Sequence, residues 1–401
     1  MKIYTCALMP FVANDAFFTR DSGLLCRSLR TLGVDSKVVM PSGEGNDDED
    51  PEEVIRAAPD EFANPEWWKS LGIDAVVFIT WGFKQHTPVI RAAREAGIRT
   101  CAIIETCGNP FPYGEILGTI RMFWRKGKFI ESFPKRLAGT AARSLLAAFN
   151  GLTEQYHRSV QIGIPHIAAF DTPSGMERCL KVARRFPRIE SRSEPILLGY
   201  PIPDSFSPRP RDQRRPNVVA VARWDALRHK RPHVLMKMID RVLPMHPAVT
   251  FEIFGRLTGA LEQWHAALAS GFQERVKLRG IQPSAAISEA LGSSQILYCP
   301  SAMDGIPLAV IEGLCGGCSV AGLETRDVAG LYWAVHEGDG SFAPDDSVAA
   351  HASAVLNELN AWEQGKRDPL KISGKWKHWF SAREVARRTI GLLITKSSPG
   401  L

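Results

Sequence analysis

Two carboxylates eight residues apart, Asp304 and Glu312, follow an apolar run over 295–299 that is typical of a strand. Pro307, which lies between them, favours a helix start, and Gly316, which follows Glu312, favours the end of that helix. A helix that begins beyond the carboxyl end of a strand offers unpaired N–H groups and the positive end of its dipole to an anion. We therefore expect a phosphate site at this helix start, with the carboxylates beside it suited to hydroxyl groups.

Basic side chains follow an earlier apolar run in the same way. Arg223 comes directly after the predicted strand 218–222, and Lys230 follows it in a loop. Arg presents a planar fork of donors and Lys a compact charge, and both suit a diphosphate. Other basic residues of that loop could take the role of Lys230, namely Arg228, His229 and Arg231.

The spacing of the two carboxylates resembles the E-x7-E signature of the family-4 group of retaining, nucleotide-sugar-dependent glycosyltransferases, with Asp304 in place of the first Glu. The strand that ends in Arg223 and the runs 249–255 and 276–280 stand in that family's order. These landmarks lie within 218–320, and the N-terminal half is similar only in general layout.

The resemblance implies catalytic and donor-binding roles for four residues. Arg223 and Lys230 would grip the donor diphosphate, whose developing charge the site must match. Glu312 would accept hydrogen bonds from the ribose hydroxyls, because an ionised carboxylate is a good acceptor for a diol. Asp304 would contact the donor sugar, although it is one methylene shorter than the family's Glu.

Backbone groups are expected to complete the donor site. The amides of Gly305, Ile306 and Leu308 would donate to phosphate or sugar. Gly255 and Gly280 follow two further predicted strands and would allow close backbone approach, although turn chemistry alone explains them equally well.

The N-terminal half is expected to hold the acceptor. Asp21, Ser22 and Gly23 take the place of the family's glycine-rich first turn, with Ser22 or Asp21 as a helix cap. Trp81 follows the third predicted strand and could line an acceptor pocket or fill the core. Glu105 stands after the fourth, where many relatives have a His, and could face the acceptor or be structural.

The fold expected is α/β. Predicted strands alternate with helices, which indicates parallel sheets covered on both faces. The strands expected are 2–8, 36–40, 75–80, 100–104, 167–170, 196–198, 218–222, 250–254, 276–278, 296–299 and 319–321. The resemblance implies the GT-B architecture, two doubly wound Rossmann-like domains facing across a cleft.

A length of 401 residues favours two domains, and the proline-dense stretch 201–210 reads as their linker. We expect an N-terminal domain over 1–205, with a basic insertion at about 110–150 and a C-terminal crossover helix at 375–395. The nucleotide-sugar-binding domain is expected over 206–374.

Composition places the chain among ordinary globular proteins, with 45% hydrophobic and 23% charged residues. No apolar run reaches the roughly 18 residues of a membrane span, and Met1 leads straight into a predicted strand without the features of a signal peptide. We expect a cytoplasmic protein. The eight cysteines favour reduced thiols, and the glycines between Cys315 and Cys318 are explained as a helix stop.

Much of the net charge of +6 gathers in one segment. Residues 115–150 carry seven Lys or Arg against two Glu, interleaved with aromatic and aliphatic residues. Such a mixture could lie on an anionic membrane surface at the inner face, or form a solvated helical hairpin.

The function expected is that of a retaining, hexosyltransferase-like enzyme in cell-surface polysaccharide synthesis. Its partners would be a sugar nucleotide and a glycan or lipid-linked acceptor, without nucleic acid. No D-x-D metal constellation stands at the donor site, so no metal or other cofactor is expected. The alternative is a degenerate member that binds nucleotide or glycan, or scaffolds other enzymes, without catalysis. A nicotinamide-dependent oxidoreductase lacks support, because no G-x-G-x-x-G follows the first strand.

Overall fold

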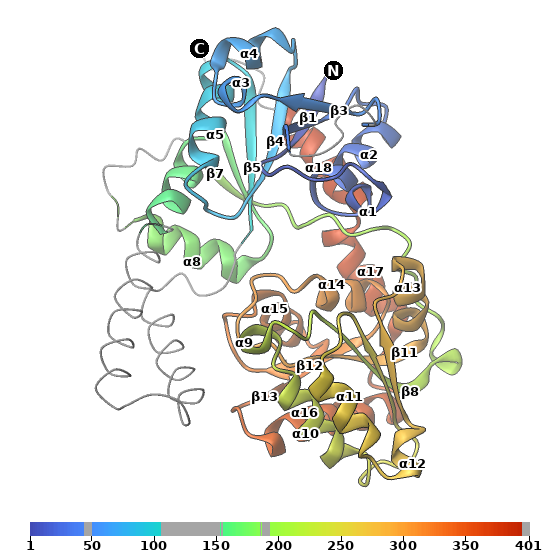
Figure 1. Cartoon of the computed structure of the whole chain (residues 1–401). Helices are drawn as coiled ribbons and strands as arrows, with labels where there is room; N and C mark the ends of the chain where they lie inside the picture. Colours follow the sequence, from blue (N-terminus) through green and yellow to red (C-terminus); the bar gives the residue numbers. More distant parts are fainter. Residues whose placement is uncertain (44–49, 106–152, 154, 185, 187–192, 395–401) are drawn as a thin grey trace, which may run out of the picture. The chain divides into compact units, whose positions relative to one another are not determined.

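The computed structural model describes residues 1–43, 50–105, 153, 155–184, 186 and 193–394. The chain divides into two compact units. The first comprises Met1–Pro201 and Val385–Leu401, and the second comprises Ile202–Glu384. Each unit is built on one parallel sheet with helices packed against it (Figure 1).

The first unit has a seven-stranded sheet in the order β3-β2-β1-β4-β5-β6-β7, and every pairing is parallel. Its strands are β1 (Ile3–Ala7), β2 (Val38–Pro41), β3 (Val54–Ala57), β4 (Ala75–Thr80), β5 (Arg99–Ile104), β6 (Ile167–Phe170) and β7 (Glu194–Leu197). Its helices include α1 (Asp15–Phe18), α2 (Asp21–Thr31), α3 (Pro59–Phe62), α4 (Pro65–Ser70), α5 (His86–Glu95), a helical segment over 155–163 and α8 (Pro173–Ala183).

Alternate residues of the strands pack into two different hydrophobic cores in this unit. Cys6 belongs to a cluster with Trp68 and Phe78, whereas the next residue, Ala7, belongs to another with Phe17. Successive side chains of a strand point to opposite faces of the sheet. Both faces are therefore covered, as expected for strands that are apolar throughout.

The second unit has a six-stranded parallel sheet in the order β10-β9-β8-β11-β12-β13. Its strands are β8 (Arg215–Val221), β9 (Thr250–Phe254), β10 (Val276–Gly280), β11 (Ser294–Cys299), β12 (Ser319–Leu323) and β13 (Gly340–Ala343). Its helices are η2 (Arg211–Gln213), α9 (Leu227–Lys230), α10 (Pro232–Val242), α11 (Gly259–Ala266), α12 (Ser270–Gln273), α13 (Ser284–Ser293), α14 (Leu308–Cys315), α15 (Ala329–His336), α16 (Val348–Glu363) and α17 (Pro369–Phe380).

Both sheets reverse their strand order beside the first strand, at β1 and β4 in one and at β8 and β11 in the other. β8 and β11 lie in register there, with Val218 opposite Ile296 and Val219 opposite Leu297. In doubly wound sheets, ligands bind outside the carboxyl ends of the strands at this reversal. The fold thus singles out the residues just after β8 and β11, and those just after β1 and β4.

The predicted α/β fold of two doubly wound parallel sheets is confirmed, and each expected strand is present. Two edge strands, β3 and β13, were not predicted. The expected crossover helix over 375–395 is two elements, the end of α17 and α18 (Ala382–Ile394), separated at Ser381. Ala382 donates its N–H to Ile202 O there (2.9 Å), and the chain enters the first unit at Val385 within α18.

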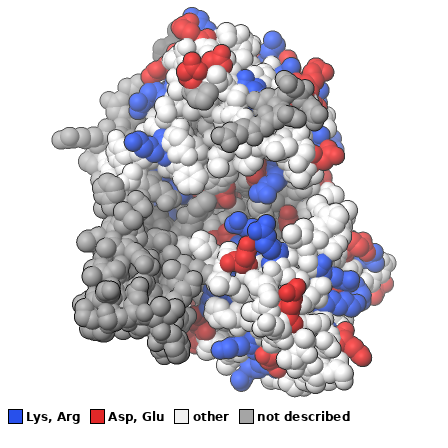
Figure 2. Space-filling model, viewed as in Figure 1, with Lys and Arg blue, Asp and Glu red and all other residues white. Residues whose placement is uncertain are grey.

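The basic insertion expected at about 110–150, including the segment 115–150, lies outside the described residues. On the face seen in Figure 2, basic and acidic side chains are interspersed over the described part of the chain. Among the described helices, none combines the length and apolar character needed to cross a bilayer.

Candidate functional site

The loop after β11 leads into a helix start with free donor capacity. Pro307 is the N-cap of α14, directly before its first residue, and no side chain caps this end. Gly305 and the Ile306 side chain are buried, and Leu308 begins the helix. The first N–H groups of a helix lack intrahelical partners, and here no side chain replaces them. The start of α14 can therefore receive an anion, as the sequence predicts.

Two predicted donor residues meet at this loop, because Lys230 Nζ forms an ion pair with Asp304 Oδ2. Asp304 is held in place by its backbone, which donates to Asp327 O (2.7 Å) and bridges to Val328. The side chains of Lys230 and Asp304 are 20% and 23% exposed, so both remain accessible. An ammonium has three donors, and Lys230 can hold Asp304 and a phosphate oxygen together.

Arg223 is exposed and lies directly beyond β8, between two anchored neighbours. Ala222 donates to Phe254 O (3.2 Å), and Trp224, which is fully buried, donates to Arg256 O (3.0 Å). Within the described residues the Arg223 side chain has no ion pair, so its guanidinium is available to a ligand. This is the place that the strand reversal singles out.

Gly255 and Gly280 fix the backbone next to Arg223. Gly255 has a φ of +103°, and a Cβ there would meet Ala222 O at 1.9 Å. Its N–H donates to Gly280 O (2.7 Å), and Gly280 has a φ of +66° with open space around it. Gly255 is required because the ends of β8 and β9 approach so closely. Both glycines set the backbone beside Arg223, and their part in a donor site stays a prediction.

Glu312 lies on α14, half-buried, next to the fully buried side chains of Ile311 and Val310. The helix is short, so Glu312 stands little more than one turn from the anion-binding start. This position permits contact with a ribose while the helix start holds a phosphate.

Lys230 and its basic neighbour Arg231 have different surroundings in the structure. The sequence had left Arg231 as an alternative to Lys230 for binding the diphosphate. Arg231 is 6% exposed, has a φ of 50°, donates from Nη1 to Pro300 O (3.2 Å) and pairs with Asp346. Arg231 therefore holds the start of the loop after β11, whereas the Lys230 side chain stays partly exposed. This bracing residue was not predicted, because the sequence gives no sign of its left-handed backbone.

Behind Arg231 lies a buried polar chain. Tyr298 and His351 share a hydrogen bond (2.9 Å), and His351 Nε2 lies 3.7 Å from Asp346 Oδ1. Burial and the Arg231 charge lower the pKa of His351 to about 4, and burial raises that of Tyr298 well above its ordinary value. Both side chains are neutral at pH 7, so this hydrogen-bonded pair supports the loop after β11 without adding charge.

In the first unit, the structure brings together the two residues predicted after β4 and β5. Trp81 donates its indole N–H to Glu105 Oε2. Arg158, which is 4% exposed, donates to Trp81 O (2.8 Å) and to Glu105 O (3.1 Å). Arg158 thus holds both loops in register. It was not predicted, because it follows the basic segment without any pattern that sets it apart.

Asp21 joins the same polar region through Tyr200. Tyr200 donates its hydroxyl to Asp21 Oδ1, and Arg20 Nε donates to Asp21 Oδ2 (3.1 Å). Burial, followed by the charges of Glu105 and Asp21, raises the pKa of Tyr200 well above its ordinary value. Tyr200 therefore lies within electrostatic reach of both carboxylates. It was missed because it stands just before the predicted linker, far along the chain from either carboxylate.

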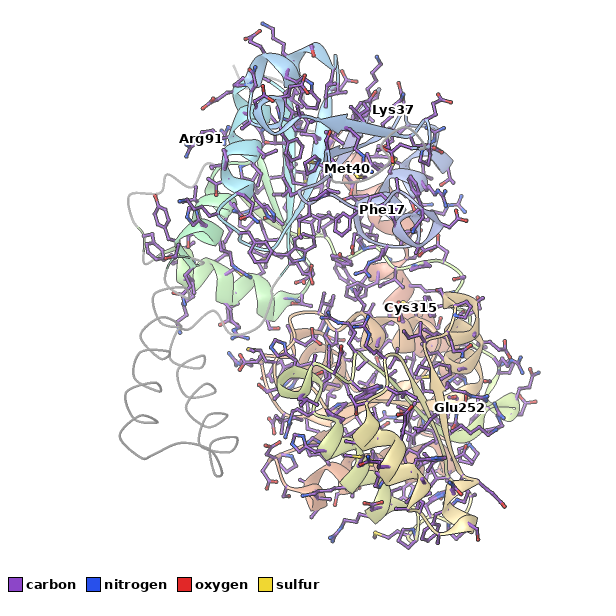
Figure 3. The ribbon with its side chains drawn as sticks, viewed as in Figure 1. Phe17, Lys37, Met40, Arg91, Glu252 and Cys315 are labelled. Atoms are coloured by element: carbon purple, nitrogen blue, oxygen red, sulfur yellow. The ribbon has the colours of Figure 1, made fainter. Side chains whose placement is uncertain are left out.

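Ser22 and Gly23 are structural, in contrast to the acceptor-facing positions expected for them. Ser22 is 1% exposed and donates to Cys6 O (3.0 Å), and a Cβ on Gly23 would meet Phe17 O at 2.6 Å. Figure 3 marks Phe17 in this unit. The predicted cap is also wrong, because Arg20 is the N-cap of α2 and makes no side-chain capping bond. Ser22 bonds α2 to β1, and Gly23 allows α2 to pack closely against Phe17 of α1.

In the part of the chain that the structure describes, no group of three His, Cys, Asp or Glu side chains could hold a metal ion. The expectation of metal-independent catalysis stays a prediction.

Residues 215–360 match the family described as "Glycosyl transferases group 1". No curated protein matches the chain at a significant level.

Several solved structures are similar over the whole chain. The lipopolysaccharide outer core galactosyltransferase WaaB in its apo form is 13% identical, with a TM-score of 0.62, over 99% of this chain and 100% of its own. HepE of Anabaena in complex with UDP and glucose is 11% identical, with a TM-score of 0.60, over 98% and 99%. Sucrose-phosphate synthase of Thermosynechococcus elongatus is 12% identical, with a TM-score of 0.59, over 98% of each chain. At these identities the likeness establishes the GT-B fold.

Proposed function

We propose that the chain, a glycosyltransferase whose residues 215–360 match the glycosyl transferases group 1 family, moves a sugar from a nucleoside diphosphate to a glycan or glycolipid with retention of configuration. The observation that carries this proposal is the Lys230–Asp304 ion pair beside the uncapped start of α14. It places a cation, a carboxylate and free N–H groups at the strand reversal of the second unit.

The donor half of the reaction follows from the charges gathered there. As the bond between the sugar and the diphosphate breaks, negative charge grows on the leaving group. Arg223, Lys230 and the α14 start are all suited to stabilise it. Glu312 would accept hydrogen bonds from the ribose, and Asp304 from the donor sugar.

The acceptor half is assigned to the first unit. Glu105 follows β5 and Asp21 begins α2, and the charges of both carboxylates act on Tyr200; acceptor hydroxyls need such hydrogen-bond acceptors. Trp81 offers an indole ring against which a sugar face can pack. Ser22 and Gly23 would support this site indirectly, because Ser22 bonds to Cys6 O and Gly23 packs against Phe17.

A nucleotide panel tests the proposal directly. UDP is the first probe, because HepE was solved with UDP, and GDP and ADP accompany it. Calorimetry should give saturable binding of one diphosphate, and the matching sugar nucleotides should then support transfer. Arg223→Ala and Glu312→Ala should abolish transfer while thermal unfolding stays unchanged. Wild-type activity in both variants would remove the donor assignment.

A second candidate is a degenerate member that binds nucleotide or glycan, or scaffolds other enzymes, without turnover. Asp304 in place of Glu, and Glu105 in place of His, favour it. Tight diphosphate binding with neither sugar transfer nor donor hydrolysis, measured across the sugar-nucleotide panel, would establish this alternative.

A role in cell-surface polysaccharide synthesis is supported by the likeness in fold to a lipopolysaccharide galactosyltransferase and by the composition of residues 115–150. Basic and aromatic residues mixed in this way suit the surface of an anionic membrane. The test is co-sedimentation with vesicles. Binding to anionic but not to neutral vesicles is expected, and equal recovery with both would remove the membrane role.

A further inference from the structure

A cavity on the first unit is lined by none of the residues assigned to the donor or the acceptor. It has a volume of about 440 Å³ and lies between α5 and the helical segment over 155–163. On α5 its wall is formed by residues at helical spacing, Thr87, Pro88 and Arg91, with Lys84 just before the helix. Residues spaced in this way share one face of a helix.

The cavity is bordered by positive charge. Lys84 and Arg91 are both exposed and, within the described residues, neither has an ion pair, and no Asp or Glu lines the cavity. Arg91 lies on α5 and Lys84 just before it, so the two cations border the cavity at different heights along the helix. Figure 3 places Arg91 on the outer side of α5, away from the sheet. A ligand with anionic groups along its length fits this arrangement.

The opposite wall is aromatic and polar. Tyr156 is 47% exposed, and its ring is held edge-on against His157 (5.3 Å) and Phe186 (5.8 Å). Thr87 Oγ1 lies 3.4 Å from His157 Nδ1. Burial and the nearby Lys84 charge lower the pKa of His157, so it is a neutral hydrogen-bonding group at pH 7. A fixed aromatic face beside neutral hydrogen-bonding groups suits the apolar face and hydroxyls of a sugar.

We propose that this cavity binds an acidic saccharide, with Lys84 and Arg91 holding its negative groups and Tyr156 packing on a sugar ring. The site lies beyond the proposed acceptor residues, and its occupation does not depend on the donor. Bound there, a carboxylate- or phosphate-bearing glycan would be anchored on the first unit.

Calorimetry on the full-length chain tests this with trigalacturonate, glucose 6-phosphate, neutral maltotriose and inorganic phosphate. We expect saturable binding of trigalacturonate or glucose 6-phosphate, and the stronger of the two identifies the negative group as carboxylate or phosphate. Maltotriose should not bind at the same concentration, and added salt should weaken the acidic ligands. Absence of saturable binding by both acidic sugars would overturn the proposal.

Variants locate the site. Lys84→Ala and Arg91→Ala should each weaken the acidic sugar about tenfold, and the double variant more, whereas Lys69→Ala, an exposed lysine on α4, should change nothing. Tyr156→Ala keeps both cations, so it should weaken the sugar but not inorganic phosphate.

Binding unaffected by the double variant would overturn the site. Phosphate binding as strong as that of the sugars, with Tyr156→Ala silent, would reduce it to a simple anion site. UDP binding, measured in parallel, should be unchanged in every variant.

Discussion

Lys230 and Asp304 are paired across 74 residues of sequence, at the carboxyl ends of the two neighbouring strands β8 and β11. The pair has a consequence for nucleotide binding. Asp304 neutralises part of the charge that a diphosphate would seek on Lys230, and its own charge repels the phosphates. In the proposed function the donor sugar, in contrast, would gain a hydrogen-bond acceptor from Asp304.

Asp304→Asn should therefore separate nucleotide binding from sugar transfer. Free diphosphate should bind roughly two- to fivefold more tightly, because a partly exposed ion pair is worth about 0.5–1 kcal/mol. Transfer should fall, because the donor sugar loses a charged acceptor. Calorimetry with the diphosphate and an assay with the sugar nucleotide measure the two effects.

Lys230→Ala is the opposing variant. It should weaken diphosphate binding and lower kcat/KM about 100-fold or more, since it removes a donor aimed at developing charge. Weaker diphosphate binding in both Asp304→Asn and Lys230→Ala would contradict the competition inferred here.

Gly255→Ala should destabilise the second unit and disturb Arg223. The added Cβ would clash with Ala222 O at 1.9 Å, and the φ of +103° is strained for any L side chain, at about 1–3 kcal/mol before the clash. Chemical denaturation followed by circular dichroism measures the loss. Gly259→Ala is the matched control, because it meets open space at the start of α11. Equal stability of the two variants would contradict the close approach.

Arg158→Lys should raise the acceptor KM and leave the donor KM unchanged. A single ammonium cannot reproduce the fork that reaches both Trp81 O and Glu105 O, so the loops after β4 and β5 lose their register. Charge-assisted hydrogen bonds are worth about 1.5–3 kcal/mol each, so the free energy of unfolding should also fall. Steady-state kinetics with each substrate varied in turn separate positioning from stability. A parallel rise in both KM values would show that Arg158 supports the whole fold rather than the acceptor loops.

The sequence was informative where function depends on residues that follow apolar strands. Arg223, Trp81 and Glu105 stand directly after such runs and Asp304 stands in the loop that follows one, and the structure joins Trp81 to Glu105 as neighbours. The residues that it did not reveal act through tertiary contacts. Arg158, for example, contacts the loops after β4 and β5 from the helical segment 155–163, in which no sequence motif distinguishes it.

The two unpredicted strands have local reasons. β3 (Val54–Ala57) includes Arg56, whose side chain bonds to Asp50 (2.6 Å), and β13 (Gly340–Ala343) has no β-branched residue. Both strands are only four residues long, too short for a clear hydrophobic pattern, and pairing with the sheet edge decides their conformation. Sequence patterns alone therefore underestimate the width of both sheets.

His351 and His86 should make the fold sensitive to mild acid. Both are fully buried, and burial lowers the pKa of each to about 4, against about 6.5 for an unfolded chain. Between these values the unfolded state binds the extra proton and the folded state does not. Stability should therefore be complete above pH 6.5 and fall toward pH 4, by about 1.4 kcal/mol per pH unit for each histidine.

Urea denaturation at pH 7, 6 and 5 measures this slope, and His351→Gln provides the test. The variant removes one of the two protons, so its free energy of unfolding should fall less steeply between pH 6 and 5 than that of the wild type. It should also be less stable at pH 7, because Tyr298 loses its buried partner. His378, which is exposed on α17, is the matched control, and His378→Gln should keep the wild-type slope. An unchanged slope in His351→Gln would mean that His351 is protonated in the folded state, paired with Asp346.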